Sequence, residues 1–271
     1  MSESHPVALH YTRGDLAAKI LTALAEDGKD LDKLTVNDLA PYDELHIRGR
    51  EATMELARWA NLTDRARVLD VGCGLGGPSR YLAATSGCEI IGLDLTHEYV
   101  ETATMFAERL GLARQVSYRQ GDALALPFDA GSFDVAWSQH AAMNIGDKRG
   151  LYGEIFRILR PGGKVALYDV CNGPGEDLLF PVPWASDPAI SFLIPPIELR
   201  DILEATGFRI RYFHDATLEA VAARVAGDER KQPPSGVRLA MGDNWQTKVT
   251  NLRKNLEERR VVVVQVMAER G

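Results

Sequence analysis

The central part of the chain alternates between short apolar runs and longer amphipathic stretches. Runs of four to seven residues rich in Val, Ile and Leu predict buried strands, and apolar positions three or four residues apart predict helices. The pattern predicts strands at 68–71, 89–93, 116–120, 133–138 and 164–170, separated by helices at 78–85, 97–110 and 151–159. This β-α-β order indicates a mostly parallel sheet with right-handed crossovers.

The flanking segments extend this pattern. Residues 1–62 contain two amphipathic stretches, and we expect them to form an N-terminal helical cap over the strand ends. Residues 171–196 are rich in Gly, Pro and aromatic side chains, which indicates a lid insertion after the fifth strand. The remainder predicts helices at 196–206 and 217–225, a strand at 208–213, a polar loop at 227–236, a helical stretch at 239–259 and a buried final strand at 261–267.

These elements predict an α/β fold with a Rossmann-like, seven-stranded, mostly parallel sheet and helices on both faces. We expect two parts, the cap at 1–62 and the main domain at 63–271, with the lid insertion inside the second.

Composition narrows the possible partners and the compartment. The formal net charge of −7 disfavours nucleic acid as a partner, because phosphate binding needs a basic surface. The polar N-terminus does not resemble a signal peptide, and no apolar run reaches membrane-spanning length. We therefore expect a cytoplasmic protein without a membrane partner. Oligomeric state is left open.

The cysteines do not indicate a metal site. Cys73, Cys88 and Cys171 contain no C-x-x-C pair, so we expect small buried residues and no metal.

A glycine-rich turn follows the first predicted strand. Gly72, Gly74 and Gly77 have the G-x-G-x-x-G spacing of a nucleotide-binding turn. Asp70 precedes the first glycine, and no Lys or Arg occurs between Val68 and Gly77 to hold a phosphate. A carboxylate here suits a ligand that carries an ammonium and a sulfonium.

Two further acids end neighbouring strands. Asp94 follows the second strand and can accept hydrogen bonds from ribose hydroxyls, as it also could in an NAD enzyme. Asp122 follows the third strand and can accept from an adenine amino group.

On these residues the sequence resembles the class I S-adenosylmethionine-dependent methyltransferases. The matching segments are VLDVGCGLGG, GLDLT, GDALALPF, SFDVAWS and LRPGGKVALYD, over about residues 66–170. The resemblance implies S-adenosyl-L-methionine as the cofactor. The residues that it implies contact this cofactor are Gly72, Gly74, Gly76, Asp94, Leu95, Asp122, Ala123 and Gln139.

The N-terminal segment is similar to small-molecule N-methyltransferases of the sarcosine/dimethylglycine and phosphoethanolamine types. That resemblance implies that Tyr11 closes over the cofactor and that Gly49 approaches its methionine end. Asn144 stands where phosphoethanolamine enzymes carry a histidine that pairs with the early tyrosine. The sequence therefore predicts methyl transfer to a small molecule, with an amine nitrogen as the first choice of acceptor.

The expected reaction is a direct SN2 transfer in which the protein positions a nucleophile in line with the methyl group. Tyr11 and His140 are the catalytic candidates, for positioning or for proton removal. His46 and two arginines, Arg48 and Arg50, are either substrate contacts or structural residues. The aromatic residues of the lid insertion are either core or a cation–π wall: Trp184 and Phe192.

Other functions fit part of the pattern. Oxygen and carbon acceptors use the same fold, and fold does not determine the acceptor atom. The glycine spacing also fits an NAD(P)-dependent oxidoreductase, and a non-catalytic S-adenosylmethionine sensor would keep the same cofactor motifs.

Overall fold

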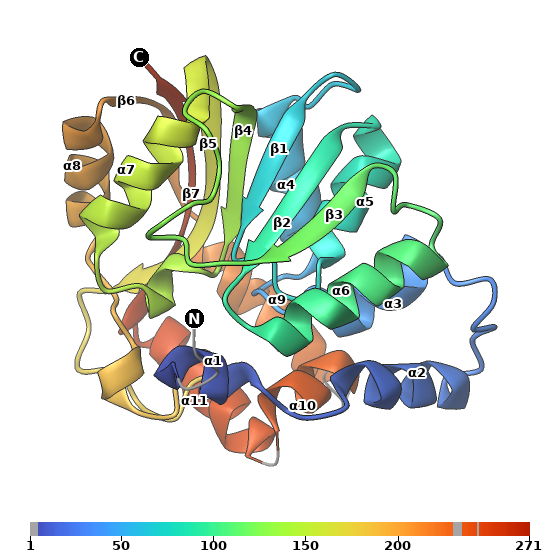
Figure 1. Ribbon diagram of the computed structural model, residues 1–271. Coiled ribbons are helices and arrows are strands. Elements are labelled where there is room, and N and C mark those ends of the chain that lie inside the picture. Colours follow the sequence, from blue (N-terminus) through green and yellow to red (C-terminus); the bar gives the residue numbers. More distant parts are fainter. Residues whose placement is uncertain (1–4, 230–234, 243) are drawn as a thin grey trace.

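The computed structural model describes residues 5–229, 235–242 and 244–271. Its centre is a seven-stranded sheet with the order β3-β2-β1-β4-β5-β7-β6 (Figure 1). All neighbours are parallel except β7, which runs antiparallel to both β5 and β6. The strands are β1 (Arg67–Val71), β2 (Glu89–Asp94), β3 (Val116–Gln120), β4 (Phe133–Gln139), β5 (Leu159–Asn172), β6 (Phe208–Asp215) and β7 (Val261–Arg270). The predicted fold class is confirmed.

Helices cover both faces of the sheet (Figure 1). The helices of the main domain are α5 (Gly77–Ser86), α6 (His97–Arg109), α7 (Lys148–Ile158), α8 (Pro196–Thr206), α9 (Thr217–Glu229), α10 (Ser235–Met241) and α11 (Trp245–Glu257). Two short 3-10 helices, η1 (Ala142–Asn144) and η2 (Pro188–Ile190), lie in the connections. The expected loop at 227–236 begins inside α9, and its centre at 230–234 lies outside the described residues.

The central strands β1, β4, β5 and β7 are buried on both faces over most of their length, as their apolar runs predict, whereas β3 and β6 are partly exposed. In β1 and β7 alternate residues enter two separate cores. Val68 and Val263 pack with α5 and α9 on one face, while Leu69 and Val264 pack with α7 and α8 on the other. Burial on both faces explains why these strands lack the polar alternation of a half-exposed sheet.

The N-terminal segment forms four helices, α1 (Pro6–Tyr11), α2 (Leu16–Glu26), α3 (Val36–Asp43) and α4 (Arg50–Ala60). These helices pack in different places, and the division into a cap at 1–62 and a main domain at 63–271 stays a prediction. The buried face of α4 contributes Ala52, Leu56 and Ala60 to the core beneath the sheet, so α4 is part of the layered domain. In contrast, α1 lies below the lower edge of the sheet, across the carboxyl ends of the parallel strands (Figure 1).

One local expectation is wrong. Leu159 begins β5 and does not end α7, because an apolar residue at this junction suits a buried strand as well as a helix. Thr96 would be a suitable N-cap for α6 from its residue type, but its side chain caps no backbone N–H there and hydrogen-bonds to Asp94.

Candidate functional site

A cavity of about 420 Å³ lies at the carboxyl ends of β1, β2 and β4, where the strand order reverses direction. Such a switch point is the usual ligand site of an open α/β sheet. The segments at the ends of β1, β2, β3 and β4, together with α1 and the segment 183–192, provide most of its lining. The predicted site residues that line it are Tyr11, Gly72, Gly74, Asp94, Leu95, Asp122, Ala123, Gln139 and His140.

The glycine turn forms one wall of the cavity. Gly72 has φ +73°, and a Cβ on this residue would lie 2.4 Å from the Cβ of Ala141. Gly74 has φ +53°, and nothing lies within 4 Å of the place where its Cβ would be. A ligand can therefore approach the backbone at Gly74. Gly76 begins α5 and Gly49 begins α4, and neither lines the cavity.

Asp94 is held in place by the turn itself. Its two carboxylate oxygens accept hydrogen bonds from the backbone N–H groups of Gly74, at 2.9 Å, and Thr96, at 2.8 Å. Burial raises the pKa of Asp94 despite these donors. Asp122 accepts from the N–H of Leu124 at 2.9 Å and also lines the cavity. Both carboxyl groups face the space where a nucleoside would lie.

The opposite end of the cavity carries two acids. Asp70 accepts a hydrogen bond from the Ser79 hydroxyl, and burial raises the pKa of Asp70 to about 7. Asp43 accepts from the Arg80 guanidinium at 2.7 Å through one oxygen, while its other oxygen is buried without a hydrogen bond in the described structure. This second oxygen lies against the glycine turn, because a Cβ on Gly77 would be 2.5 Å from it, while the residue as a whole lines the cavity.

The residues present therefore fit S-adenosylmethionine. Asp43 and Asp70 can hold its ammonium group, Gly74 allows close approach, and Asp94 and Asp122 can accept from ribose and adenine. Sequence reasoning did not identify Asp43, because it lies far before the glycine turn and belongs to no motif. Within the described residues, no group of His, Cys, Asp and Glu side chains is arranged to hold a metal ion.

Tyr11 pairs with Asn144 across the cavity. The phenol donates a hydrogen bond of 2.8 Å to the Asn144 side-chain oxygen. The Asn144 amide nitrogen donates to the carbonyls of Trp184, at 2.9 Å, and Ile190, at 3.0 Å, which sets the orientation of the amide. Burial raises the pKa of Tyr11 well above 10, so the phenol stays protonated near neutral pH. This argues for positioning by Tyr11 and against proton removal.

His140 follows β4 directly and lines the cavity. Its φ of +53° turns the chain sharply, and its backbone N–H donates to the carbonyl of Tyr168 at 2.8 Å. The imidazole stacks on the Tyr168 ring with a centroid distance of 5.1 Å. The side chain is therefore held at the strand end by both its backbone and its ring.

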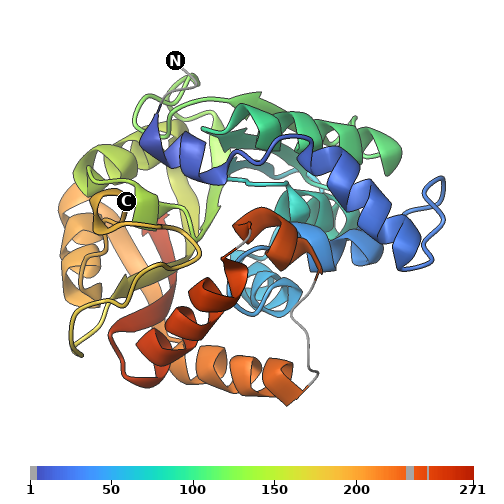
Figure 2. The same cartoon turned by 90° about the horizontal axis from the view of Figure 1, so that it is seen from below.

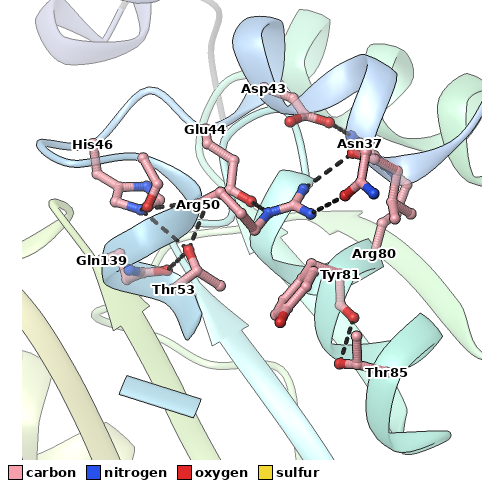
Figure 3. Close-up of polar contacts among 12 residues, drawn as sticks. Asn37, Asp43, Glu44, His46, Arg50, Thr53, Arg80, Tyr81, Thr85 and Gln139 are labelled. Atoms are coloured by element: carbon pink, nitrogen blue, oxygen red, sulfur yellow. Dashed lines mark hydrogen bonds and ion pairs between the residues drawn. The ribbon is translucent and has the colours of Figure 1, made fainter. Parts of the chain in front are cut away.

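A polar cluster beneath the cavity contains His46, Thr53, Gln139 and Glu44 (Figure 3). The Thr53 hydroxyl lies 2.6 Å from Glu44, 3.1 Å from His46 Nε2 and 3.2 Å from Gln139 Oε1. His46 Nε2 also lies 2.9 Å from the Gly49 carbonyl, and burial lowers the pKa of His46. His46 and Gln139 line the cavity, so a neutral imidazole and an amide are available to a ligand.

The two arginines of this segment have structural partners. Arg50 bonds Glu44 and the carbonyl of Val36, while Arg48 pairs with Glu51 and Glu55. Neither arginine lines the cavity. Trp184 and Phe192 both do, the first buried and the second partly exposed.

Hydrogen bonds without carboxylate partners join α1 and the loop after β4 to the lid insertion. His10 contacts the Ser186 hydroxyl at 2.9 Å and the Pro183 carbonyl at 3.0 Å. The buried amine of Lys148 donates to three carbonyls, those of Ala142, Ile145 and Phe192. The loop after β4 and the lid insertion are thus joined through one side chain.

The sheet order with its antiparallel β7, and a glycine turn flanked by acids at the strand ends, define the class I S-adenosylmethionine-dependent methyltransferase fold. Residues 69–167 match the family described as "Methyltransferase domain". The chain thus carries a methyltransferase domain, and the predicted resemblance and cofactor are confirmed.

Curated relatives match mainly over this domain. A sterol 24-C-methyltransferase of Eremothecium gossypii is 40% identical over 114 residues, covering 42% of this chain and 31% of the relative. The chloroplastic tocopherol O-methyltransferase of Arabidopsis thaliana is 37% identical over 149 residues, covering 52% and 42%. The chain therefore spans less than half the length of these relatives.

Solved structures extend the likeness to the whole fold. A phosphoethanolamine N-methyltransferase 2 of Haemonchus contortus has a TM-score of 0.72 at 21% identity, covering 87% of this chain and 57% of that one. The [4+2]-cyclase SpnF has a TM-score of 0.67 at 22% identity, covering 94% and 93%. One of these structures is named as a methyltransferase and the other as a cyclase, so the likeness shows only that this chain has their fold. The methyl acceptor must be inferred from this chain's own residues.

Proposed function

We propose that this protein transfers the methyl group of S-adenosylmethionine to the oxygen or carbon of a small, largely apolar molecule. The observation that carries the proposal is that the matched methyltransferase domain coincides with the cavity: its glycine turn and its acids at 94 and 122 line the wall. A sterol and a tocopherol, named as the acceptors of the curated relatives, are both largely apolar.

The remaining wall of the cavity supports an apolar acceptor. It is formed by side chains of α1, η1 and the lid insertion: Val7, Met143, Ile145, Trp184, Ile190 and Phe192. The expected amine acceptor has less support, because the named relatives are C- and O-methyltransferases and the N-methyltransferase neighbours share only the fold.

When bound, S-adenosylmethionine supplies a methyl group already activated on a sulfonium. In the proposed reaction Tyr11 and Asn144 hold α1 closed over the cavity, and Asp43 and Asp70 fix the cationic end. His140, held at the end of β4, would accept the proton that the acceptor loses, while the sulfonium carbon–sulfur bond breaks and S-adenosylhomocysteine leaves as a neutral thioether. Exclusion of water by α1 and the lid insertion keeps the nucleophile desolvated.

Two experiments test this proposal. Calorimetric titration with S-adenosylhomocysteine should show binding, and titration with NADH should show none. Tritiated S-adenosylmethionine should then label a product from a panel of sterols, phenols and amines. Binding of NADH alone would overturn the proposal, and exclusive labelling of amines would restore the nitrogen acceptor. Cofactor binding without turnover of any acceptor would favour the sensor hypothesis.

No helix in the described part of the chain is both long and apolar enough to span a bilayer. The cytoplasmic location and the absence of nucleic-acid and membrane partners stay predictions.

A further inference from the structure

A second hollow, of about 1010 Å³, lies on the other side of α1 from the cavity. Val7 and Tyr11 of α1 line the cavity, whereas Leu9 and His10 line this second hollow. Figure 2 views this end of the molecule, with α1 in dark blue and α10 and α11 in red. We call it the basic groove. Its described lining residues are Leu9, His10, Arg13, Lys19, Ser186, Arg238, Leu239, Met241, Gly242, Asn244, Trp245 and Lys248.

Cations from three elements gather in the basic groove. Lys248 of α11 is only 2% exposed, and its amine donates one hydrogen bond, of 3.0 Å, to the Met241 carbonyl. Arg13 donates through Nε to the neighbouring Ala240 carbonyl at 2.8 Å, and Lys19 of α2 lies alongside, donating to the Arg13 carbonyl. Among the lining residues that the structure describes there is no Asp or Glu.

The positive charge is only partly offset by the protein. Ala240 and Met241 end α10, whose carbonyl dipoles supply at most about half a negative charge. The Glu98 carboxylate accepts from the backbone N–H groups of Arg13 and Leu16, at 2.6 and 3.0 Å. No described acid forms an ion pair with the side chain of Arg13, Lys19 or Lys248.

Burial is the main cause that lowers the pKa values of Lys248 and His10, and the neighbouring positive charges lower them further. Burial, followed by the Arg13 charge, lowers the pKa of Lys248 to about 8. The pKa of His10 is lowered to about 4. Burial is the largest cause, a hydrogen bond to Pro183 acts in the opposite direction, and the charges of Lys248 and Arg13 also lower the pKa. A buried ammonium without a carboxylate partner is costly, and a bound anion would offset that cost.

We propose that the basic groove binds a phosphate group carried by a small molecule, a site separate from the methyl-transfer cavity. A phosphate offers several acceptor oxygens, which match the two remaining N–H donors of Lys248 and the guanidinium of Arg13. The rest of the ligand would lie against the apolar and aromatic lining, Leu9, Leu239 and Trp245. The ligand would contact both the α1–α2 junction and α11, on the outer side of the helix that covers the cavity.

The test uses inorganic pyrophosphate as the probe, titrated calorimetrically into the full chain at constant ionic strength set with sodium chloride. Saturable binding to the unmodified protein is expected. The variants Lys248→Met and Arg13→Gln should each weaken binding about tenfold, the effect of one charge-assisted hydrogen bond of about 1.4 kcal/mol. Lys254→Met is the matched control, because Lys254 is exposed on the same helix and does not line the groove.

Two additional measurements keep the proposal falsifiable. Thermal unfolding establishes that each variant folds, and Lys248→Met should be at least as stable as the parent without pyrophosphate, since it removes an uncompensated buried charge. Co-sedimentation with phosphatidylcholine vesicles, with and without phosphatidic acid, tests a lipid as the source of the phosphate. Dependence on phosphatidic acid and on Lys248 would support the site with a lipid ligand. Absence of binding to both probes, or binding equal in Lys248→Met, Arg13→Gln and the control, would overturn it.

Discussion

The phenol of Tyr11 and the side-chain amide of Asn144 meet at 2.8 Å, although 133 residues separate them in the chain. The pair links α1 to η1, and through the carbonyls of Trp184 and Ile190 it also links α1 to the lid insertion. One amide thus connects the three segments that cover the cavity.

We predict that this pair contributes to cofactor retention. Tyr11→Phe should weaken S-adenosylhomocysteine binding five- to tenfold, because a hydrogen bond of about 1 kcal/mol is lost from the closed state. Asn144→Leu should have an effect at least as large. In a double-mutant cycle measured by calorimetry, the two changes together should cost clearly less than their sum. Additive losses would show that the two side chains act independently.

His140 is predicted to act in the chemical step. His140→Asn keeps a residue that tolerates positive φ and removes the imidazole, so the backbone at the end of β4 should be preserved. We expect kcat to fall about 100-fold or more with little change in S-adenosylhomocysteine affinity. The measurement is turnover of the acceptor found by the labelling panel. Equal turnover in the variant would remove His140 from the catalytic residues.

The glycine turn gives a matched pair of substitutions. Gly72→Ala should destabilise the fold by about 2–3 kcal/mol, because its methyl group would collide with Ala141. Gly74→Ala should cost only about 1 kcal/mol from its positive φ, but its methyl group would enter the cavity and weaken cofactor binding. Urea unfolding and calorimetry separate the two effects. Similar stability loss in both variants would contradict the packing at Gly72.

His10 makes the stability of the folded protein depend on pH, and the lowered pKa of His10 gives the direction of that dependence. An exposed histidine in the unfolded chain takes up a proton near pH 6.5, but the pKa of His10 in the folded protein is about 4. His10 therefore makes its full contribution to the free energy of unfolding, about 3 kcal/mol, above pH 6.5. This contribution is lost as the pH falls toward 4. Buried carboxyl groups with raised pKa values, such as Asp70, act in the opposite direction.

His10→Gln should remove this contribution because glutamine does not titrate. The test compares urea unfolding of the parent and the variant between about pH 7 and about pH 4.5. The stability difference between them should shrink or reverse as the pH falls. A difference independent of pH would show that His10 is as exposed to protonation in the folded state as in the unfolded chain.

The sheet could be predicted from sequence because its strands are short apolar runs that need no distant information. The helix Pro196–Thr206 was also predictable at both ends, from its proline and from Gly207 with φ +109°. By contrast, α1 has six residues, which is too short for a periodic signal, and depends on Pro6 and the His5 cap.

The glycines that line the cavity, Gly72 and Gly74, were predictable because one motif contains them. Asp43 was not, since only folding brings it beside the turn at Gly77, where a Cβ would lie 2.5 Å from its carboxylate. The contacts of His10 with Pro183 and Ser186 span more than 170 residues and follow no pattern in the sequence. The residues that join α1 to the lid insertion therefore come from segments that are far apart in the sequence, and no local sequence pattern predicts their contact.

The environment of Lys148 depends on the contact between the loop after β4 and the lid insertion. All three of its N–H donors are used on carbonyls from two different segments, and its amine is buried with a lowered pKa. An amine in that position is shielded from acylating reagents as long as these contacts persist. Its rate of modification would therefore report how often, if at all, Phe192 and the loop after β4 come apart in solution.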